Sequence, residues 1–247
     1  MLSKVSNLSV FKEVLAHANG IIVDLGAGRV RFAKSLLENP KVREVVAIEI
    51  DFNKLHEAKN QYREQKLHLV CGSITYLPLR ESSIDTAISI LVLHELAGGK
   101  EEVEKAVKEA KRILKAGGKL IIVDKYLYKP KDPAEALSLI IEDLYHEALR
   151  EAKGIKLWGL QKPEEYLNIV KKYFNKVTWR KMERGKKIPG EVFVKECGWG
   201  KETKSLVKMI EDENTRRILE NKIKEVEETA LKYGYKSSKV LEIIAEK

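Results

Sequence analysis

The chain alternates short runs of apolar residues with longer segments in which apolar residues recur every three or four positions. Continuous short runs are typical of strands buried on both faces, whereas the wider spacing is typical of helices with one buried side. The runs predict strands at residues 21–23, 44–51, 67–71, 84–90 and 119–124. The spaced segments predict helices at residues 9–18, 32–38, 53–64 and 101–114. Strands that alternate with helices in this way indicate a Rossmann-like, doubly wound α/β domain with a mostly parallel sheet.

The pattern changes after residue 125. Helices are predicted at residues 132–153 and 163–173, and strands at residues 177–183 and 191–196 are predicted to pair as a terminal antiparallel hairpin, which makes a seven-stranded sheet. The rest of the chain is predicted to be helical, with a last helix that begins at Ser237 or Ser238 and runs through Ala245. We therefore expect one domain at residues 1–198, a helical lid inserted at about residues 126–161, and a C-terminal helical extension at residues 199–247.

The predicted C-terminal helices carry an apolar stripe. Leu219, Ile223, Val226 and Ala230 follow one another at steps of four, three and four. This spacing is typical of a coiled-coil or docking face. The stripe is compatible with a homodimer, with a contact to another protein and with packing on the chain's own domain. The sequence leaves these alternatives open.

A glycine turn follows the first predicted strand. The strand ends in Asp24, and Gly26 and Gly28 come next, before the predicted helix. Glycine accepts a positive φ and lets a ligand lie against bare backbone, and the start of a helix adds free N–H donors. Glu49, at the end of the second strand, lies about twenty residues further on, where a ribose-binding acid is expected in a nucleotide-binding βαβ unit. Ile50 then offers an apolar face to a base.

Composition narrows the class of protein. Of 247 residues, 44% are hydrophobic and 34% are charged, which is enough for a core and argues against disorder. The sequence has no apolar run long enough to span a membrane and no signal-peptide pattern, so we expect a cytoplasmic protein. Cys71 and Cys197 lie far apart without metal-binding spacing, so no metal is expected. The many lysines and glutamates, with few glutamines, resemble the surface of a thermophile protein.

The positive charge is concentrated in one segment. The chain carries a formal net charge of +9, and residues 171–187 contain eight lysines and arginines against the single acidic residue Glu183. A local excess of this kind is compatible with an RNA substrate. It is more typical of a solvated lysine-rich face, and no aromatic and basic RNA-binding module accompanies it.

Several motifs together resemble those of class I S-adenosylmethionine-dependent methyltransferases. They are Asp24, Gly26 and Gly28 in the first turn, Glu49, the segment 77–79 before the fourth strand, and the segments 91–96 and 114–120. They occur in the family's order and spacing over roughly residues 9–125. The resemblance implies an enzyme with S-adenosyl-L-methionine as its cofactor, and the aromatic lid is similar to that of the ubiquinone- and menaquinone-biosynthesis type.

The resemblance also implies roles for single residues. Asp24, Gly26, Ala27 and Gly28 would hold the amino-acid part of the cofactor, and Glu49 would bind the ribose. Ile50 would pack on the adenine, Ser73 and Ile74 would meet its edge, and Leu91 would lie beneath the sulfonium. Two positions depart from the family pattern. Val30 stands where a third glycine is usual, and Ser73 stands where an Asp or Asn often binds the adenine amino group.

The methyl acceptor is less defined. The fourth strand lacks the Asn/Asp-Pro-Pro-aromatic segment of enzymes that methylate amino nitrogens of bases and glutamine, so we expect a small molecule with an oxygen or carbon acceptor. His94 follows that strand and is a candidate general base, or else a structural residue at a strand–helix junction. The aromatic residues of the predicted lid are Tyr126, Tyr128, Tyr145 and Trp158. They would either cover a ligand or pack between helices. A non-catalytic cofactor-binding or scaffold protein, with its helical tail as the partner contact, is a further alternative.

Overall fold

The fold centres on a seven-stranded mixed sheet with the strand order β3-β2-β1-β4-β5-β7-β6. The structure is a computed structural model that describes residues 8–247. The strands are β1 (Gly20–Leu25), β2 (Val42–Glu49), β3 (Leu67–Cys71), β4 (Ile84–Ile90), β5 (Leu114–Lys125), β6 (Lys176–Met182) and β7 (Val240–Glu246). Strands β1 to β5 are parallel, and β7 runs antiparallel to both of its neighbours. The expected Rossmann-like, mostly parallel seven-stranded sheet is confirmed.

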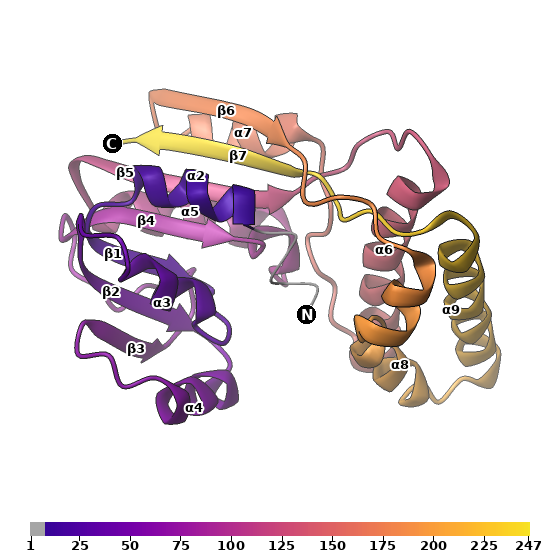
Figure 1. The fold of residues 1–247 in the computed structure, drawn as a ribbon. Coiled ribbons are helices and arrows are strands. Elements are labelled where there is room, and N and C mark those ends of the chain that lie inside the picture. Colours follow the sequence, from indigo (N-terminus) through magenta and orange to yellow (C-terminus); the bar gives the residue numbers. More distant parts are fainter. Residues whose placement is uncertain (1–7) are drawn as a thin grey trace.

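Helices cover both faces of this sheet, as Figure 1 shows. Helices α2 (Leu8–His17), α3 (Arg31–Leu36) and α4 (Phe52–Gln61) belong to one side, and α5 (Lys100–Ile113) and α7 (Pro163–Lys171) to the other. Alternate residues along each strand point to opposite faces, so Ile22 packs under the first group of helices and Val23 under the second. Two apolar cores, one on each face, therefore fix the sheet and align the carboxyl ends of β1, β2 and β4 along one edge.

Three further helices form a separate cluster beyond the carboxyl ends of β4 and β5. They are α6 (Pro133–Lys153), α8 (Lys201–Lys208) and α9 (Glu213–Tyr233), and they share a third apolar core with the short π-helical turn η2 (Val192–Glu196). We call this group the helical cluster. None of the helices in residues 8–247 is both long and apolar enough to cross a membrane.

The last strand corrects the predicted C-terminal extension. Residues 240–246 form β7, inserted between β5 and β6, and not the expected helix through Ala245. Ile243 and Ala245 are fully buried, and Glu242 is buried in an ion pair with Arg180 (2.5 Å between Oε2 and Nε). The boundary expected at residue 198 therefore does not separate the sheet from the rest of the chain, because α8 and α9 lie in an insertion between β6 and β7.

The strand predicted at residues 191–196 is also wrong. Its run of apolar residues forms the turn η2, in which the ring of Phe193 stacks between Trp199 and Tyr235, with centroid distances of 5.4 and 4.2 Å. This aromatic stack buries Phe193 in the core of the helical cluster. The true partner of β6 is β7.

The apolar stripe of α9 is used within the chain. Leu219, Ile223, Val226 and Ala230 are all buried in the core of the helical cluster. Lys222 of α9 also pairs with Glu147 of α6, with 2.6 Å between Nζ and Oε2. The stripe therefore packs on α6 and α8, so a homodimer through α9 would have to use its other face.

Candidate active site

The glycine turn after β1 is tied to the neighbouring strand β2. The backbone N–H groups of Gly26 and Ala27 both donate to the carbonyl of Ile48, each at 2.9 Å. Gly26 has a φ of 73°, and a Cβ there would lie 2.7 Å from the methyl groups of Val92. Only glycine fits this position, because any side chain would be strained and would collide with the loop after β4. The turn is thus held close against the ends of two other strands.

Glu49 ends β2 and joins the turn through its carboxylate. The N–H of Gly28 donates to Oε2 at 2.7 Å, and the N–H of Asp51 donates to Oε1 at 3.0 Å. A carboxylate has about four lone-pair positions, so these two bonds leave room for two more. Glu49 is therefore oriented by backbone donors and can still accept hydrogen bonds from a pair of ligand hydroxyls.

Asp24 lies in β1 directly behind this turn. Its side chain is 3% exposed, and its Oδ2 has no hydrogen-bond partner in the described part of the chain. Burial, together with the nearby Glu49 carboxylate, raises the pKa of Asp24 to about 7. A buried carboxylate without a partner is unfavourable, and a cationic ligand group is the partner that restores its ionised form.

Val30 occupies the position of the missing third glycine in a left-handed conformation. Its φ is 61°, and its side chain is fully buried beside α3, the helix that it caps. A β-branched residue is strained in this region of φ and ψ, which glycine adopts freely. Val30 therefore keeps the backbone conformation of the glycine that is usual at this position, and its side chain adds buried apolar contacts.

We expect Val30→Gly to be more stable than Val30→Ala by about 1 kcal/mol, the reverse of the usual order of these two residues. Both variants lose buried methyl groups, but only glycine relieves the left-handed strain. Urea denaturation of the two variants and the wild type measures the difference. If Val30→Ala were the more stable variant, the left-handed backbone at residue 30 would be contradicted.

The residues expected at the adenine lie at the ends of β2 and β3. Ile50 is 71% exposed, so it offers an apolar surface, and Ile74 is buried in the core. The hydroxyl of Ser73 shares a hydrogen bond with that of Thr75 at 2.8 Å. Leu91, at the end of β4, has a φ of 58°, and its N–H donates to the carbonyl of Val123 at 2.8 Å. All the predicted cofactor residues therefore lie along one edge of the sheet.

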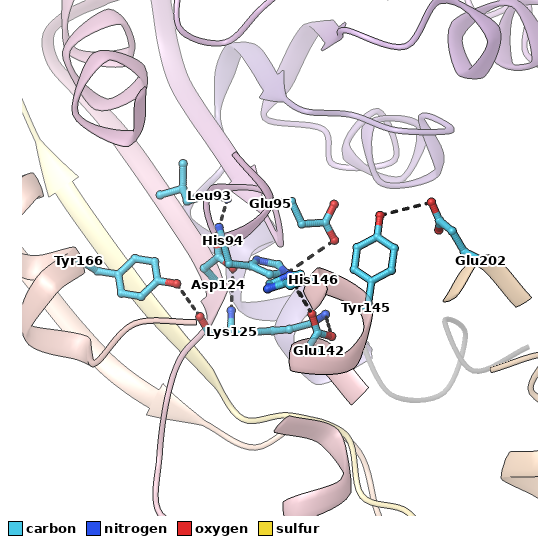
Figure 2. Close-up of polar contacts among 10 residues, drawn as sticks. All are labelled: Leu93, His94, Glu95, Asp124, Lys125, Glu142, Tyr145, His146, Tyr166 and Glu202. Carbon is cyan, nitrogen blue, oxygen red and sulfur yellow. Dashed lines mark hydrogen bonds and ion pairs between the residues drawn. The ribbon is translucent and has the colours of Figure 1, made fainter. Parts of the chain in front are cut away.

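His94 lies one strand further along, in the short helix η1 (Leu93–Glu95), and is fully buried. Its Nδ1 contacts Oδ1 of Asp124 from the end of β5 (Figure 2). The second oxygen, Oδ2 of Asp124, accepts the N–H groups of Leu93 (2.7 Å) and His94 (3.4 Å). Burial alone would lower the pKa of His94, but the Asp124 carboxylate outweighs it and the pKa is raised. His94 and Asp124 are thus a buried ion pair that joins β5 to the loop after β4.

Asp124 was not among the expected site residues, although its signal is the same as that of Asp24, an acidic residue that ends an apolar strand.

The aromatic residues of the predicted lid, expected either to cover a ligand or to pack between helices, differ in their contacts. Trp158 packs edge-on against Tyr166 (4.6 Å between centroids), Tyr126 is buried, and Tyr128 bonds to Ser138. Tyr145 instead points its hydroxyl at Glu202 of α8.

Comparison with known proteins agrees with this arrangement. Residues 23–122, which contain the glycine turn, Glu49, His94 and most of β5, match the family described as "Methyltransferase domain". Residues 23–122 are therefore a methyltransferase domain, and the chain has the fold of class I S-adenosylmethionine-dependent methyltransferases. S-adenosylmethionine is the methyl donor of this family, and the unpartnered Oδ2 of Asp24 and the bare backbone at Gly26 and Gly28 fit its ammonium-bearing amino-acid end.

Solved structures share the fold of this methyltransferase at low sequence identity. The YcgJ protein of Bacillus subtilis is 17% identical with a TM-score of 0.63, and the match covers 97% of this chain and 98% of that one. An S-adenosylmethionine-dependent methyltransferase of Mesorhizobium loti is 14% identical with a TM-score of 0.58, covering 99% and 100%. A chain from a complex with the Haloferax volcanii Trm112 methyltransferase activator is 16% identical with a TM-score of 0.59, covering 95% and 87%. No curated protein matches the sequence.

Proposed function

We propose that this methyltransferase transfers the methyl group of S-adenosylmethionine to a small molecule bound between the carboxyl ends of β4 and β5 and the helical cluster. The observation that carries the proposal is the closeness of α6 to the end of β4. Oε2 of Glu142 in α6 lies 3.7 Å from Nε2 of His94. A helix packed so near the acceptor side of the sheet limits the size of what can bind there, which favours a small acceptor.

In this proposal each cofactor residue has a simple task. Asp24 binds the ammonium group, Glu49 accepts the ribose hydroxyls, and Ile50 packs on the adenine, while Leu91 contacts the region of the sulfonium. S-adenosylmethionine supplies a methyl group that is already electrophilic, so the protein has to align the acceptor and exclude water. His94 is fully buried and already held by Asp124, and this favours a positioning role over direct contact with the acceptor.

The basic segment 171–187 gives less support to an RNA acceptor than its charge suggests. Three of its eight basic residues, Lys172, Lys176 and Arg180, form ion pairs with Glu104, Glu246 and Glu242 at 2.5–2.8 Å. Lys181 lies over the ring of Tyr126. Charges neutralised within the chain release few counterions on binding RNA, so a weak salt dependence is expected.

Transfer of a labelled methyl group distinguishes the two acceptor classes. The purified protein is incubated with methyl-labelled S-adenosylmethionine and, separately, with the small-molecule and RNA fractions of a cell extract. We expect label in the small-molecule fraction at several times the level of an Asp24→Asn control, and background label in RNA. Label that enters RNA, and only RNA, would overturn the small-molecule acceptor while leaving the methyltransferase activity in place.

A further inference from the structure

Two buried imidazole nitrogens lie near one carboxylate on the acceptor side of the sheet (Figure 2). Nε2 of His94 and Nε2 of His146 are both buried, and neither has a hydrogen bond in the described part of the chain. Oε2 of Glu142 lies 3.7 Å from the first nitrogen and 4.0 Å from the second. The other oxygen, Oε1 of Glu142, is held by Lys125 of β5. Glu142 is therefore fixed through one oxygen and keeps the other near both histidines.

His146 also forms part of the wall of a cavity beside α6. The cavity is open to solvent, has a volume of about 480 Å³ and lies between α6 and the segment 156–160, and we call it the side cavity. Helical spacing places Glu147 and Arg150 on the face of α6 that lines the side cavity, whereas Glu142 faces the loop after β4. His146 lies at the boundary between these two faces and belongs to both.

The two ring nitrogens of His146 face different sides. Nε2 faces Glu142, whereas Nδ1 faces Gly159 in the wall of the side cavity, where an added Cβ would lie 3.5 Å from Nδ1. The N–H of Gly159 donates to the carbonyl of His94 at 2.9 Å, so this wall is attached to the loop after β4. Because glycine has no side chain, it does not cover the Nδ1 edge of the ring, and the side chain of His146 stays 15% exposed. The imidazole therefore connects the buried carboxylate with the side cavity.

The surroundings keep His146 neutral and Glu142 ionised. Burial, together with the positive charges of His94 and Lys125, lowers the pKa of His146 despite the carboxylate of Glu142. Burial raises the pKa of Glu142, but the charges of Lys125 and His94 outweigh it and the pKa is lowered. The other ionisable groups near the ring are Tyr145 and, along the side cavity, Asp143, Glu147, Arg150 and Lys156. Neither His146 nor Glu142 retains a proton at neutral pH, so a proton that reaches them moves on to solvent.

From this arrangement we propose that His146 carries the proton released by methyl transfer from the acceptor side of the sheet to the solvent in the side cavity. The inference rests on the proposed function, since it concerns the proton of that reaction. Methyl transfer from a sulfonium leaves the electron pair on sulfur, so a positive charge moves to the acceptor, and an O–H or C–H acceptor loses it as one proton. Oε2 of Glu142 accepts this proton and passes it to Nε2 of His146, while Nδ1–H gives its own proton to water. Proton exchange with water in the side cavity then restores the first tautomer of the ring.

Chemical rescue tests this role in the labelled-methyl assay with the small-molecule fraction. His146→Ala removes the ring and leaves a space that joins the side cavity, so free imidazole can enter it. Pyrazole is a ring of the same size that is not basic at neutral pH, so it fills the space without carrying a proton. The matched control is His68→Gln, an exposed histidine of β3 that pairs with Glu44. Calorimetry with S-adenosylhomocysteine and thermal unfolding show that each variant binds ligand and is folded.

We expect His146→Ala to lower the rate of methyl transfer about 100-fold and to bind S-adenosylhomocysteine within about twofold of the wild type. Imidazole should raise the rate of this variant about tenfold, pyrazole should leave it unchanged, and His68→Gln should keep the wild-type rate. His146→Gln preserves most of the side-chain volume but cannot relay a proton, and it provides the test if the alanine variant does not fold. Its rate should be as low as that of His146→Ala and should rise with buffer concentration, whereas the wild-type rate should not.

The outcomes separate the proton relay from the proposed function. If His146→Ala transfers methyl groups at the wild-type rate, or if pyrazole restores the rate as well as imidazole does, the relay is refuted and the methyltransferase function stands. A loss of rate that neither ring restores also refutes the relay, because the ring would then act through packing alone. If the folded wild type transfers no label to any fraction, the proposed function fails, and the relay fails with it.

Discussion

Replacing Asp24 with asparagine is expected to weaken the binding of S-adenosylmethionine by about 100-fold while stabilising the ligand-free protein at pH 8. The carboxylate is buried and has one oxygen without a partner, so the ammonium of the cofactor would form a buried ion pair with it. Loss of one member of such a pair costs about 3 kcal/mol or more, which corresponds to a factor of about 100 or more in affinity. In the ligand-free state the same charge is uncompensated, and its removal is expected to raise the free energy of unfolding by roughly 2–4 kcal/mol.

Asp24 is expected to give folding stability and cofactor affinity opposite dependences on pH. The folded pKa of about 7 lies above the ordinary value of 3.8, so between these pH values the folded state binds a proton that the unfolded state has lost. The free energy of unfolding should therefore decrease as the pH rises from about 4 to about 7. Cofactor affinity should increase as the pH rises through about 7, because the ammonium group binds the ionised carboxylate.

Calorimetry with S-adenosylhomocysteine at pH 6, 7 and 8, combined with urea denaturation without ligand, measures both effects. Asp24→Asn should remove the contribution of Asp24 from the pH profile of ligand affinity and from that of folding stability. The control is Asp85→Asn, at the opposite end of the sheet, where Asp85 is paired with Lys115 and Arg43. That variant should bind the ligand within about twofold of the wild type. An Asp24→Asn protein with wild-type affinity would remove Asp24 from the cofactor site.

Asp124→Asn should lower the free energy of unfolding by about 3–5 kcal/mol at pH 6, the second large effect. Asp124 is 1% exposed, and besides the His94 ring it accepts the N–H groups of Leu93 (2.7 Å) and Lys125 (2.8 Å). An asparagine would direct an NH₂ group at one of these donors and would leave the charge of His94 without its partner. The loop after β4 should lose its attachment to β5 as a consequence.

The stability that this ion pair contributes also decreases as the pH rises, as it does for Asp24, but the decrease falls above pH 6.5. The folded pKa of His94 is raised above its ordinary 6.5, so the stabilisation is complete below pH 6.5 and is lost as the pH rises through the folded value. Urea denaturation between pH 5.5 and 8.5 should show a steeper decrease in the wild type than in Asp124→Asn, because both proteins keep the contribution of Asp24. Asp143→Asn, at an exposed position of α6, is the control and should change stability by less than about 0.5 kcal/mol. Equal stability of wild type and Asp124→Asn at pH 6 would contradict the buried pair.

The sequence was sufficient where local pattern and burial agree. The strands at residues 67–71 and 84–90 were predicted with their observed bounds, because both are short apolar runs that pair in the parallel sheet, the first half-exposed at its edge and the second buried within it. Strand β7 was missed because alanine and the glutamates Glu242 and Glu246 favour helix, and only its position between β5 and β6 makes it a strand. The partner that neutralises Glu242, Arg180, is about sixty residues away in sequence, and no local rule finds it.

In the candidate site, too, contacts within one local unit could be predicted from the sequence, and contacts that depend on tertiary packing could not. Asp24, Gly26 and Glu49 belong to one βαβ unit whose spacing is fixed, so their proximity could be predicted and is confirmed by the hydrogen bond from Gly28 to Glu49. Tyr145 of α6 and Glu202 of α8, in contrast, are hydrogen-bonded only because α6 and α8 share the core of the helical cluster. Their meeting depends on tertiary packing that hydrophobic spacing does not encode.

The position of β7 has a consequence for the order in which the chain can fold. Lys119 of β5 pairs with Glu246, so the antiparallel half of the sheet joins residues separated by more than half of the chain. During synthesis, β1 to β5 leave the ribosome long before β7, and the apolar edge of β5 has no partner until then. An open edge of this kind invites pairing with other chains. We therefore expect the nascent protein to be most prone to aggregation while the helical cluster is being made, and to become resistant once residues 240–246 emerge.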